Sequence, residues 1–182
     1  MVLGFFSMRR STVGLALAAL SFALIGAAGA GTTAKSFADG RWSGTSHLAK
    51  TIEGFTLNGN ATFAFRVVQG RVVSGALTAN GSARGASEGQ TVTITITGRI
   101  PLSGPAAAPS GRAKLKVVVH IGAKSQTASQ GFIYTFTGLR GTCNRMTGTI
   151  VRKLEEAVAG TDTSSTSAPF VATRAAGSGP RC

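Results

Sequence analysis

Acidic, histidine and cysteine side chains, which carry most acid–base and metal chemistry in proteins, are scarce in this 182-residue sequence. It holds six acidic residues and two histidines, and none of them is spaced to pair for proton transfer. Glu155 and Glu156 are adjacent, so on a helix their side chains would diverge, and His47 and His120 are far apart. No nucleophile motif, phosphate-binding glycine loop or dinucleotide fingerprint is present. We therefore expect no enzyme, no catalytic residue, no metal and no cofactor.

The two cysteines, Cys143 and Cys182, are the remaining candidates for chemistry. In an oxidising compartment a single pair indicates a disulfide rather than a metal site. Such a bridge would tie the C-terminus to the last hairpin, and its loop entropy is worth about 4 kcal/mol in the chain model. The alternative is a buried thiol at Cys143 and a reactive one at a frayed end.

Positive charge dominates the chain, with 19 Lys and Arg residues and a formal net charge of +13. Arg112, Lys114 and Lys116 alternate with apolar residues, which predicts a strand with one charged face turned to solvent. Such a basic surface would favour anionic envelope polymers or lipid headgroups as partners. Aromatic residues that could stack on bases fall on the opposite faces of the predicted strands, so we do not expect specific nucleic-acid binding.

The N-terminus has the layout of an export signal. Arg9 and Arg10 precede an uncharged, Ala/Leu-rich run over 13–29, which ends in the cleavage pattern Ala28-Gly29-Ala30. We predict a signal peptide at residues 1–30 and a secreted, extracellular or periplasmic protein with no transmembrane anchor after cleavage. A retained anchor is the rival interpretation. The arginine pair also suggests the twin-arginine route, but Ser11-Thr12-Val13 lacks the bulky apolar residues that usually follow such a pair, which favours general secretion.

Alternation with a period of two residues predicts the fold. Val92, Ile94 and Ile96 alternate with threonines, and similar runs give seven or eight strands, with Gln69-Gly70 and Asn80-Gly81 as turn signals. The inward-facing positions define a predicted core of Trp42, Phe55, Leu57, Phe63, Phe65, Leu77, Val92, Ile94, Ile96, Leu115, Val117, Phe132, Phe136 and Ile150.

The predicted organisation is a barrel domain over 31–159 and a Ser/Thr/Gly-rich C-terminal tail over 160–182, which the disulfide would tie. A short helix is expected over Lys153–Ala159. Regular strand spacing and the lack of long helical patterns predict an all-β, antiparallel up-and-down barrel, with a β-sandwich as the alternative.

The segment Asp39-Gly40-Arg41-Trp42 opens the first strand and resembles the start of calycin barrels, the family of lipocalins and avidins. In that family the tryptophan plugs one end of the barrel, often beneath an arginine of the last strand, and a helix may follow. Arg152 and Lys153–Ala159 stand where those features would be. The resemblance implies a small apolar molecule held inside the barrel.

Two functions follow as expectations. The first is a secreted, non-catalytic binding protein that encloses a small apolar or amphipathic ligand. Its expected ligand-binding residues are the inward aromatics Trp42, Phe63, Phe65, Phe132, Tyr134 and Phe136. The alternative is a basic, envelope-associated surface or adhesion protein, held on anionic polymers by Arg112, Lys114 and Lys116.

Overall fold

The computed structural model describes residues 36–52, 54–87, 89–155 and 165–179. These residues form nine strands and no helix. The strands are β1 (Gly40–Ile52), β2 (Phe55–Val68), β3 (Arg71–Ser87), β4 (Gln90–Pro101), β5 (Gly104–Pro105), β6 (Ser110–Ile121), β7 (Lys124–Gly141), β8 (Arg145–Leu154) and β9 (Ser165–Arg174). Within the described ranges there is accordingly no helix long and apolar enough to cross a membrane.

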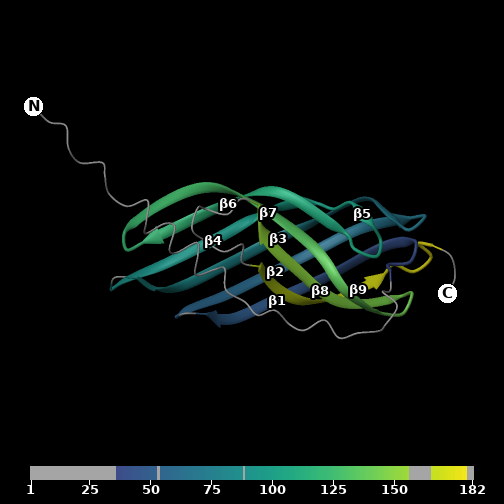
Figure 1. Cartoon of the computed structure of the whole chain (residues 1–182), viewed down its shortest axis with the longest axis horizontal. Helices are drawn as coiled ribbons and strands as arrows, with labels where there is room; N and C mark the ends of the chain where they lie inside the picture. The colour runs from purple at the N-terminus through teal and green to yellow at the C-terminus, as the bar shows by residue number, and fades with distance from the viewer. Residues whose placement is uncertain (1–35, 53, 88, 156–164, 180–182) are drawn as a thin grey trace, which may run out of the picture.

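Eight long strands form one antiparallel sheet that closes on itself (Figure 1). The order around the ring is β1, β2, β3, β4, β6, β7, β8 and β9, and β9 pairs with β1. Apart from the closing pair of β9 with β1, long strands that are neighbours in the ring are also consecutive long strands along the chain. The two-residue β5 pairs with the start of β3. The predicted all-β, antiparallel fold with up-and-down strand order is confirmed, because the strands pair in one sheet that closes in a ring.

Alternation along each strand builds the interior. On β4, Val92, Ile94 and Ile96 are buried, while the intervening threonines are exposed or half-buried. Every one of the fourteen predicted core residues is buried. The pleat sends successive side chains to opposite faces, so a run of β-branched and aromatic residues at alternate positions is enough to fix which face lies inside.

Of the two predicted turns, Gln69-Gly70 is confirmed and Asn80-Gly81 is wrong. Gln69 and Gly70 adopt positive φ angles of 51° and 70°, as the tight β2–β3 hairpin requires. Both backbone amides donate to the carboxylate of Asp39, at 2.7 and 3.0 Å. Asn80-Gly81 is not a turn, because both residues lie inside β3, which continues to Ser87.

The sequence boundaries at the C-terminal end were wrong. Residues 165–174, expected to belong to a tail outside the barrel, form β9 and complete the ring. Its Ser and Thr residues occupy mostly outward positions, while Phe170 and Ala172 are buried. The expected helix is also wrong at its start, since Lys153 and Leu154 belong to β8; residues 156–159 lie outside the described part of the chain.

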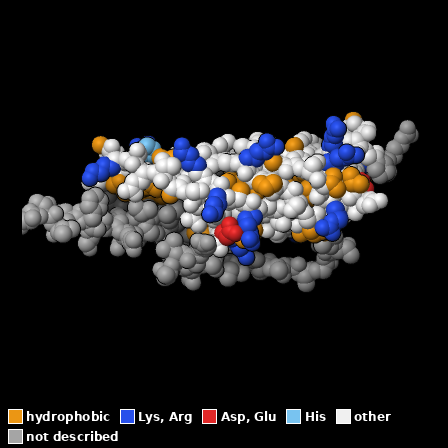
Figure 2. All heavy atoms as spheres, turned by 90° about the horizontal axis from the view of Figure 1, so that it is seen from above, with side chains coloured by type: hydrophobic (Ala, Val, Ile, Leu, Met, Phe, Trp, Pro, Cys, Tyr) orange, Lys and Arg blue, Asp and Glu red, His pale blue; other side chains and the backbone are white. Residues whose placement is uncertain are grey.

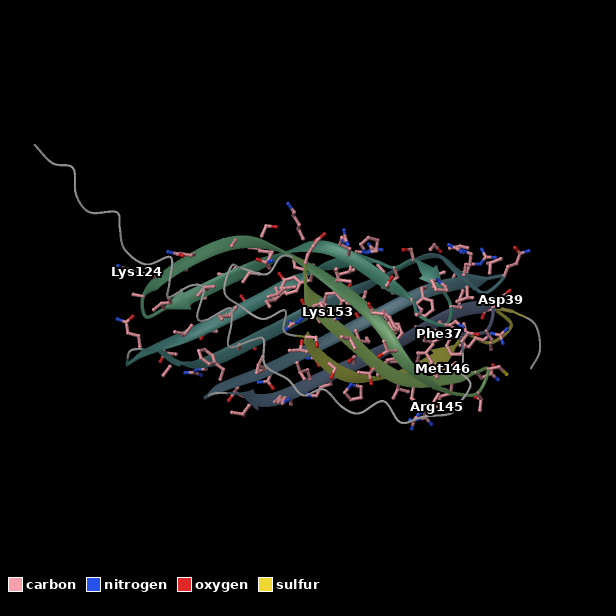
Figure 3. All side chains as sticks on the ribbon, in the orientation of Figure 1. Phe37, Asp39, Lys124, Arg145, Met146 and Lys153 are labelled. Carbon is pink, nitrogen blue, oxygen red and sulfur yellow. The ribbon has the colours of Figure 1, made fainter. Side chains whose placement is uncertain are left out.

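One end of the barrel, where β1 begins and β9 ends, is filled; we call it the closed end. Phe37, just before β1, is 1% exposed and lies at this end together with Asp39 and Met146 (Figure 3). Its amide donates to the carbonyl of Ala106 at 3.1 Å, so the β4–β6 connection folds against it. The rings of Phe37, Trp42, Phe63, Phe65, Phe136 and Phe170 form one cluster with several centroid distances of 4.9 to 6.2 Å.

The opposite end, marked by Lys124 in Figure 3, is built by fewer strands. Lys153, close to the end of β8, lies about midway along the molecule, and the pairing of β7 with β8 stops at Phe132 and Leu154. Beyond that level β1, β2, β3, β4, β6 and β7 continue as a six-stranded sheet. Among the described residues, the ring is therefore complete over the half that holds the aromatic cluster.

Candidate functional site

A cavity of about 70 Å³ lies where the complete ring gives way to the six-stranded sheet. Seven of the eight ring strands contribute to its wall, so the cavity is inside the barrel. Its lining consists of Ser46, Leu48, Gly59, Asn60, Ala61, Ala79, Asn80, Gly81, Ile96, Tyr134, Ile150, Arg152, Thr166, Ser167 and Ala168.

Small residues at inward positions make the cavity. Gly59 and Gly81 are register partners on β2 and β3, and Ala61 and Ala79 form the neighbouring inward pair. A Cβ atom added at Gly59 would come no closer than 3.7 Å to another atom, and one at Gly81 no closer than 3.6 Å. Neither glycine has a positive φ. The backbone would therefore accept a side chain at Gly59 and at Gly81, and the effect of glycine at these positions is to leave space in the cavity.

Other inward glycines have a packing role instead. At Gly98 an added Cβ would lie 2.7 Å from a methyl carbon of Leu115, and at Gly148 it would lie 2.8 Å from the ring of Phe170. These positions are glycine because a large neighbour already occupies the space. The contrast separates Gly59 and Gly81 from the glycines that merely allow the sheet to pack.

The described part of the cavity wall carries a charged side chain, Arg152, and a phenol, Tyr134. The guanidinium of Arg152 lies 5.5 Å from the ring centroid of Phe132, a cation–π distance. Burial raises the pKa of Tyr134 above its usual value, while the charge of Arg152 and a hydrogen bond with it act in the opposite direction. A buried phenol beside a guanidinium gives this side of the cavity donors suited to an anionic or strongly polar group.

The seam between β1 and β9 borders the cavity. The paired register of these strands runs only from Trp42 to Ser46 on β1, and Ser46 Oγ donates to the carbonyl of Pro169 at 2.7 Å. Proline has no backbone amide to continue the ladder, which explains why pairing stops at this residue. Residues on both sides of the unpaired stretch, Leu48 and Thr166 among them, line the cavity.

The six aromatic residues expected to bind a ligand divide into two groups. Trp42, Phe63, Phe65 and Phe136 belong to the packed aromatic cluster and do not line the cavity. Tyr134 lines the cavity, and Phe132 is buried beneath the guanidinium of Arg152.

The predicted ligand-binding residues miss most of the actual lining, because all six are aromatic whereas the lining consists mostly of small and polar residues. The signal that could have shown the cavity is the in-phase pair of small residues on each of two consecutive strands, Gly59 with Ala61 and Ala79 with Gly81.

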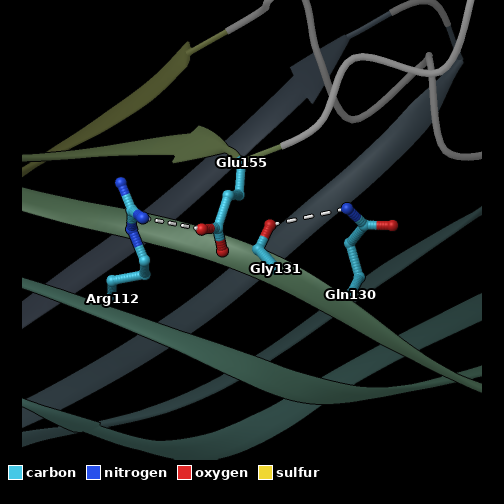
Figure 4. Close-up of polar contacts among 4 residues, drawn as sticks. All are labelled: Arg112, Gln130, Gly131 and Glu155. Carbon is cyan, nitrogen blue, oxygen red and sulfur yellow. Dashed lines mark hydrogen bonds and ion pairs between the residues drawn. The ribbon is translucent and has the colours of Figure 1, made fainter.

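The predicted basic face lies outside the barrel, as expected. Arg112, Lys114 and Lys116 are exposed on β6, whereas Leu115 and Val117 between them are buried. Arg112 Nη1 forms an ion pair with Glu155 Oε1 at 3.0 Å, beside the β7 residues Gln130 and Gly131 (Figure 4). The charge on this face is therefore partly neutralised within the chain.

Cys143 lies in the β7–β8 turn and is not a free cysteine. Cys182 falls outside the described residues, so its pairing with Cys143 stays a prediction. Among the residues that the structure describes, no three His, Cys, Asp or Glu side chains lie close enough together to hold a metal ion.

Trp42 and Arg152, the two residues that the calycin resemblance would bring together, lie in different parts of the barrel. Trp42 is buried at the closed end, where its Nε1 donates to the carbonyl of Ala38 at 2.7 Å. Its register partner on the last strand is Arg174, whereas Arg152 lies at the cavity. Comparison of the chain with protein-family models, curated sequences and solved structures finds no match.

Proposed function

We propose that this chain is a non-catalytic binding protein that holds a small amphipathic molecule in the barrel cavity. The observation that carries the proposal is the opposed pair Gly59 and Gly81, which leaves space in the wall where a side chain would fit. Glycine weakens a strand interior, so its use at two facing positions without a steric need favours a role for the space itself.

The lining indicates the chemistry of the ligand. Leu48, Ile96 and Ile150 offer apolar surface, and Arg152 with Tyr134 offers hydrogen-bond donors and a positive charge. Among the residues that the structure describes, none of those lining the cavity is acidic. A short aliphatic chain with a carboxylate head fits both parts, because guanidinium–carboxylate hydrogen bonds are among the strongest available to a protein.

Size limits the ligand further. An engineered protein cavity of about 150 Å³ accommodates benzene. A cavity of about 70 Å³ would enclose only a few carbon atoms. The remainder of a longer ligand would extend through the seam between β1 and β9, where the strands are unpaired beyond Ser46.

The test is an NMR titration of the isotopically labelled chain with hexanoate, using hexanol and hexylamine as ligands matched in length. Saturable amide shifts at Gly59, Gly81 and Ala168 are expected with hexanoate and weaker ones with hexanol. Gly81→Val should fill the cavity and abolish the shifts, whereas the control Lys114→Gln/Lys116→Gln should leave them unchanged. Equal responses to hexanoate and hexylamine, or shifts confined to exposed basic residues, would reject the proposal.

We also propose that the barrel is calycin-like and that the chain is exported and cleaved after Ala30. The calycin assignment is supported by Trp42, which is buried at the closed end beside the last strand. Export is supported by the apolar run over 13–29 behind Arg9 and Arg10, and by Cys143, which is not a free cysteine. Peptide mass mapping of the protein recovered outside the cell would identify its first residue.

A further inference from the structure

Arginine is concentrated at the closed end of the barrel. Five exposed arginines lie at or near the closed end: Arg41, Arg66, Arg71, Arg140 and Arg145. The described lysines all lie elsewhere, on β6, near the end of β8 or towards the opposite end. Figure 2 shows Lys and Arg side chains along the whole visible face, several of them next to exposed hydrophobic side chains at the end that carries β5 in Figure 1. Guanidinium groups bind phosphate and carboxylate groups bidentately, which ammonium groups cannot do.

Three of these residues form what we call the arginine cluster, namely Arg41, Arg66 and Arg71 on the adjoining strands β1, β2 and β3. Arg41 and Arg66 are direct register partners on the outer face. Like charges in directly opposite positions destabilise an antiparallel pair. Within the described ranges neither has a carboxylate at ion-pair distance, and Asp39 uses both carboxylate oxygens on the β2–β3 turn. An external anion would relieve this repulsion.

A β-bulge places an apolar side chain beside the cluster. The register shifts from Val67–Val72 to Arg66–Ser74, so Val73 is the extra residue of β3. Val73 is 56% exposed and is one of two exposed large hydrophobic residues in the described chain. Gly75 fixes the distortion, because its φ is +151° and an added Cβ would collide with Phe65. Bulges commonly redirect a side chain at functional surfaces.

We propose that the closed end of the barrel docks on an anionic lipid surface, with the arginine cluster on the phosphates and Val73 at the headgroup boundary. Cations next to an exposed aliphatic residue suit an interface that offers phosphates above hydrocarbon. A soluble anionic polymer would make no use of Val73.

The experiment compares co-sedimentation of the full chain with vesicles of phosphatidylcholine alone and of phosphatidylcholine mixed with phosphatidylglycerol. Arg41→Gln/Arg66→Gln is matched by Lys114→Gln/Lys116→Gln, which removes the same charge from β6. Wild type and variants share one N-terminus, so any contribution of the apolar run cancels. Unfolding midpoints check the fold, and Arg41→Gln/Arg66→Gln should be at least as stable as wild type because it removes a repulsive pair.

Binding to the anionic vesicles should fall about thirty-fold in Arg41→Gln/Arg66→Gln and at most a few-fold in the β6 control, with added salt weakening wild type most. Val73→Ser should weaken vesicle binding and leave binding to soluble polyphosphate unchanged. Equal losses in both double variants would show that only net charge acts, and would overturn the proposal. Polyphosphate binding as tight as vesicle binding, with Val73→Ser inert on both, would also overturn it in favour of a polymer.

Discussion

Gly59 on β2 and Gly81 on β3 are direct register partners on neighbouring strands, and a Cβ atom added at either position makes no contact shorter than 3.6 Å. Gly44 on β1 is different, because an added Cβ there would collide with the Val171 carbonyl and the ring of Phe63. Glycine is needed at position 44 because neighbouring atoms leave no room for a side chain, whereas at positions 59 and 81 there is room for a side chain and glycine leaves it empty.

The first prediction compares alanine at these two positions. Gly81→Ala should raise the free energy of unfolding by about 0.5–1 kcal/mol, because alanine loses less backbone freedom on folding. Gly44→Ala should lower it by about 1–3 kcal/mol through overpacking. Urea denaturation of both variants measures the difference, and a destabilised Gly81→Ala would mean that glycine is needed there for the backbone.

The second prediction concerns Tyr134, the one tyrosine of the chain, whose phenolate absorbance can therefore be followed alone. Because burial raises its pKa, the absorbance midpoint in alkaline titration should lie above the ordinary value of 10.0. Arg152→Gln should move the midpoint higher still, since it removes a charge that favours the phenolate.

The free energy of unfolding should also depend on the ionisation of Tyr134, in a direction that follows from its raised pKa. The folded-state pKa is raised, so the stabilisation is complete below the unfolded value and is lost as the pH rises through the folded one. Tyr134→Phe should remove this part of the alkaline loss. A wild-type midpoint at the ordinary tyrosine value would contradict the buried environment of the phenol.

A third prediction follows from Asp39, which accepts hydrogen bonds from the Gly70 and Gln69 amides. These bonds lower its pKa below 3.8, so its contribution to stability is present above that pH and disappears as the pH falls through the folded-state value. Asp39→Asn should lower the thermal midpoint at neutral pH and flatten its acid dependence.

Glu155→Gln is the matched control for this carboxylate. It removes a negative charge from an ion pair whose arginine is 66% exposed. Exposed pairs contribute little, so the midpoint should change less than in Asp39→Asn. An equal change in the two variants would show that net charge, rather than the turn contact, is responsible.

The fourth prediction tests the proposed bridge between Cys143 and Cys182. Reduction should lower the free energy of unfolding by about 4 kcal/mol in the chain-entropy model. Cys182→Ser should reproduce the loss and be insensitive to reductant. Alkylation and mass spectrometry of the unreduced protein decide the matter directly, because two alkylated cysteines would exclude the bridge.

Much of the fold follows from local pattern, and the failures have specific causes. The strand with Val92, Ile94 and Ile96 is recognisable because the pleat has a fixed period of two. The predicted core does not include Phe37 or Phe170, because one precedes the first strand and the other lies in a segment whose Ser, Thr and Gly content is typical of a tail. Composition describes the solvent face of β9, whereas burial depends on the two strands beside it.

The sequence by itself determined an all-β chain, the inward face of its strands and the outward position of Arg112, Lys114 and Lys116, since side-chain alternation is a local property of the extended backbone. Only the tertiary structure decided that the sheet closes through β9, that the aromatic half is filled, and that Gly59 meets Gly81 beside Arg152. These relations depend on strand register and ring closure, which join residues far apart in the chain and cannot be recognised from the sequence of a single strand.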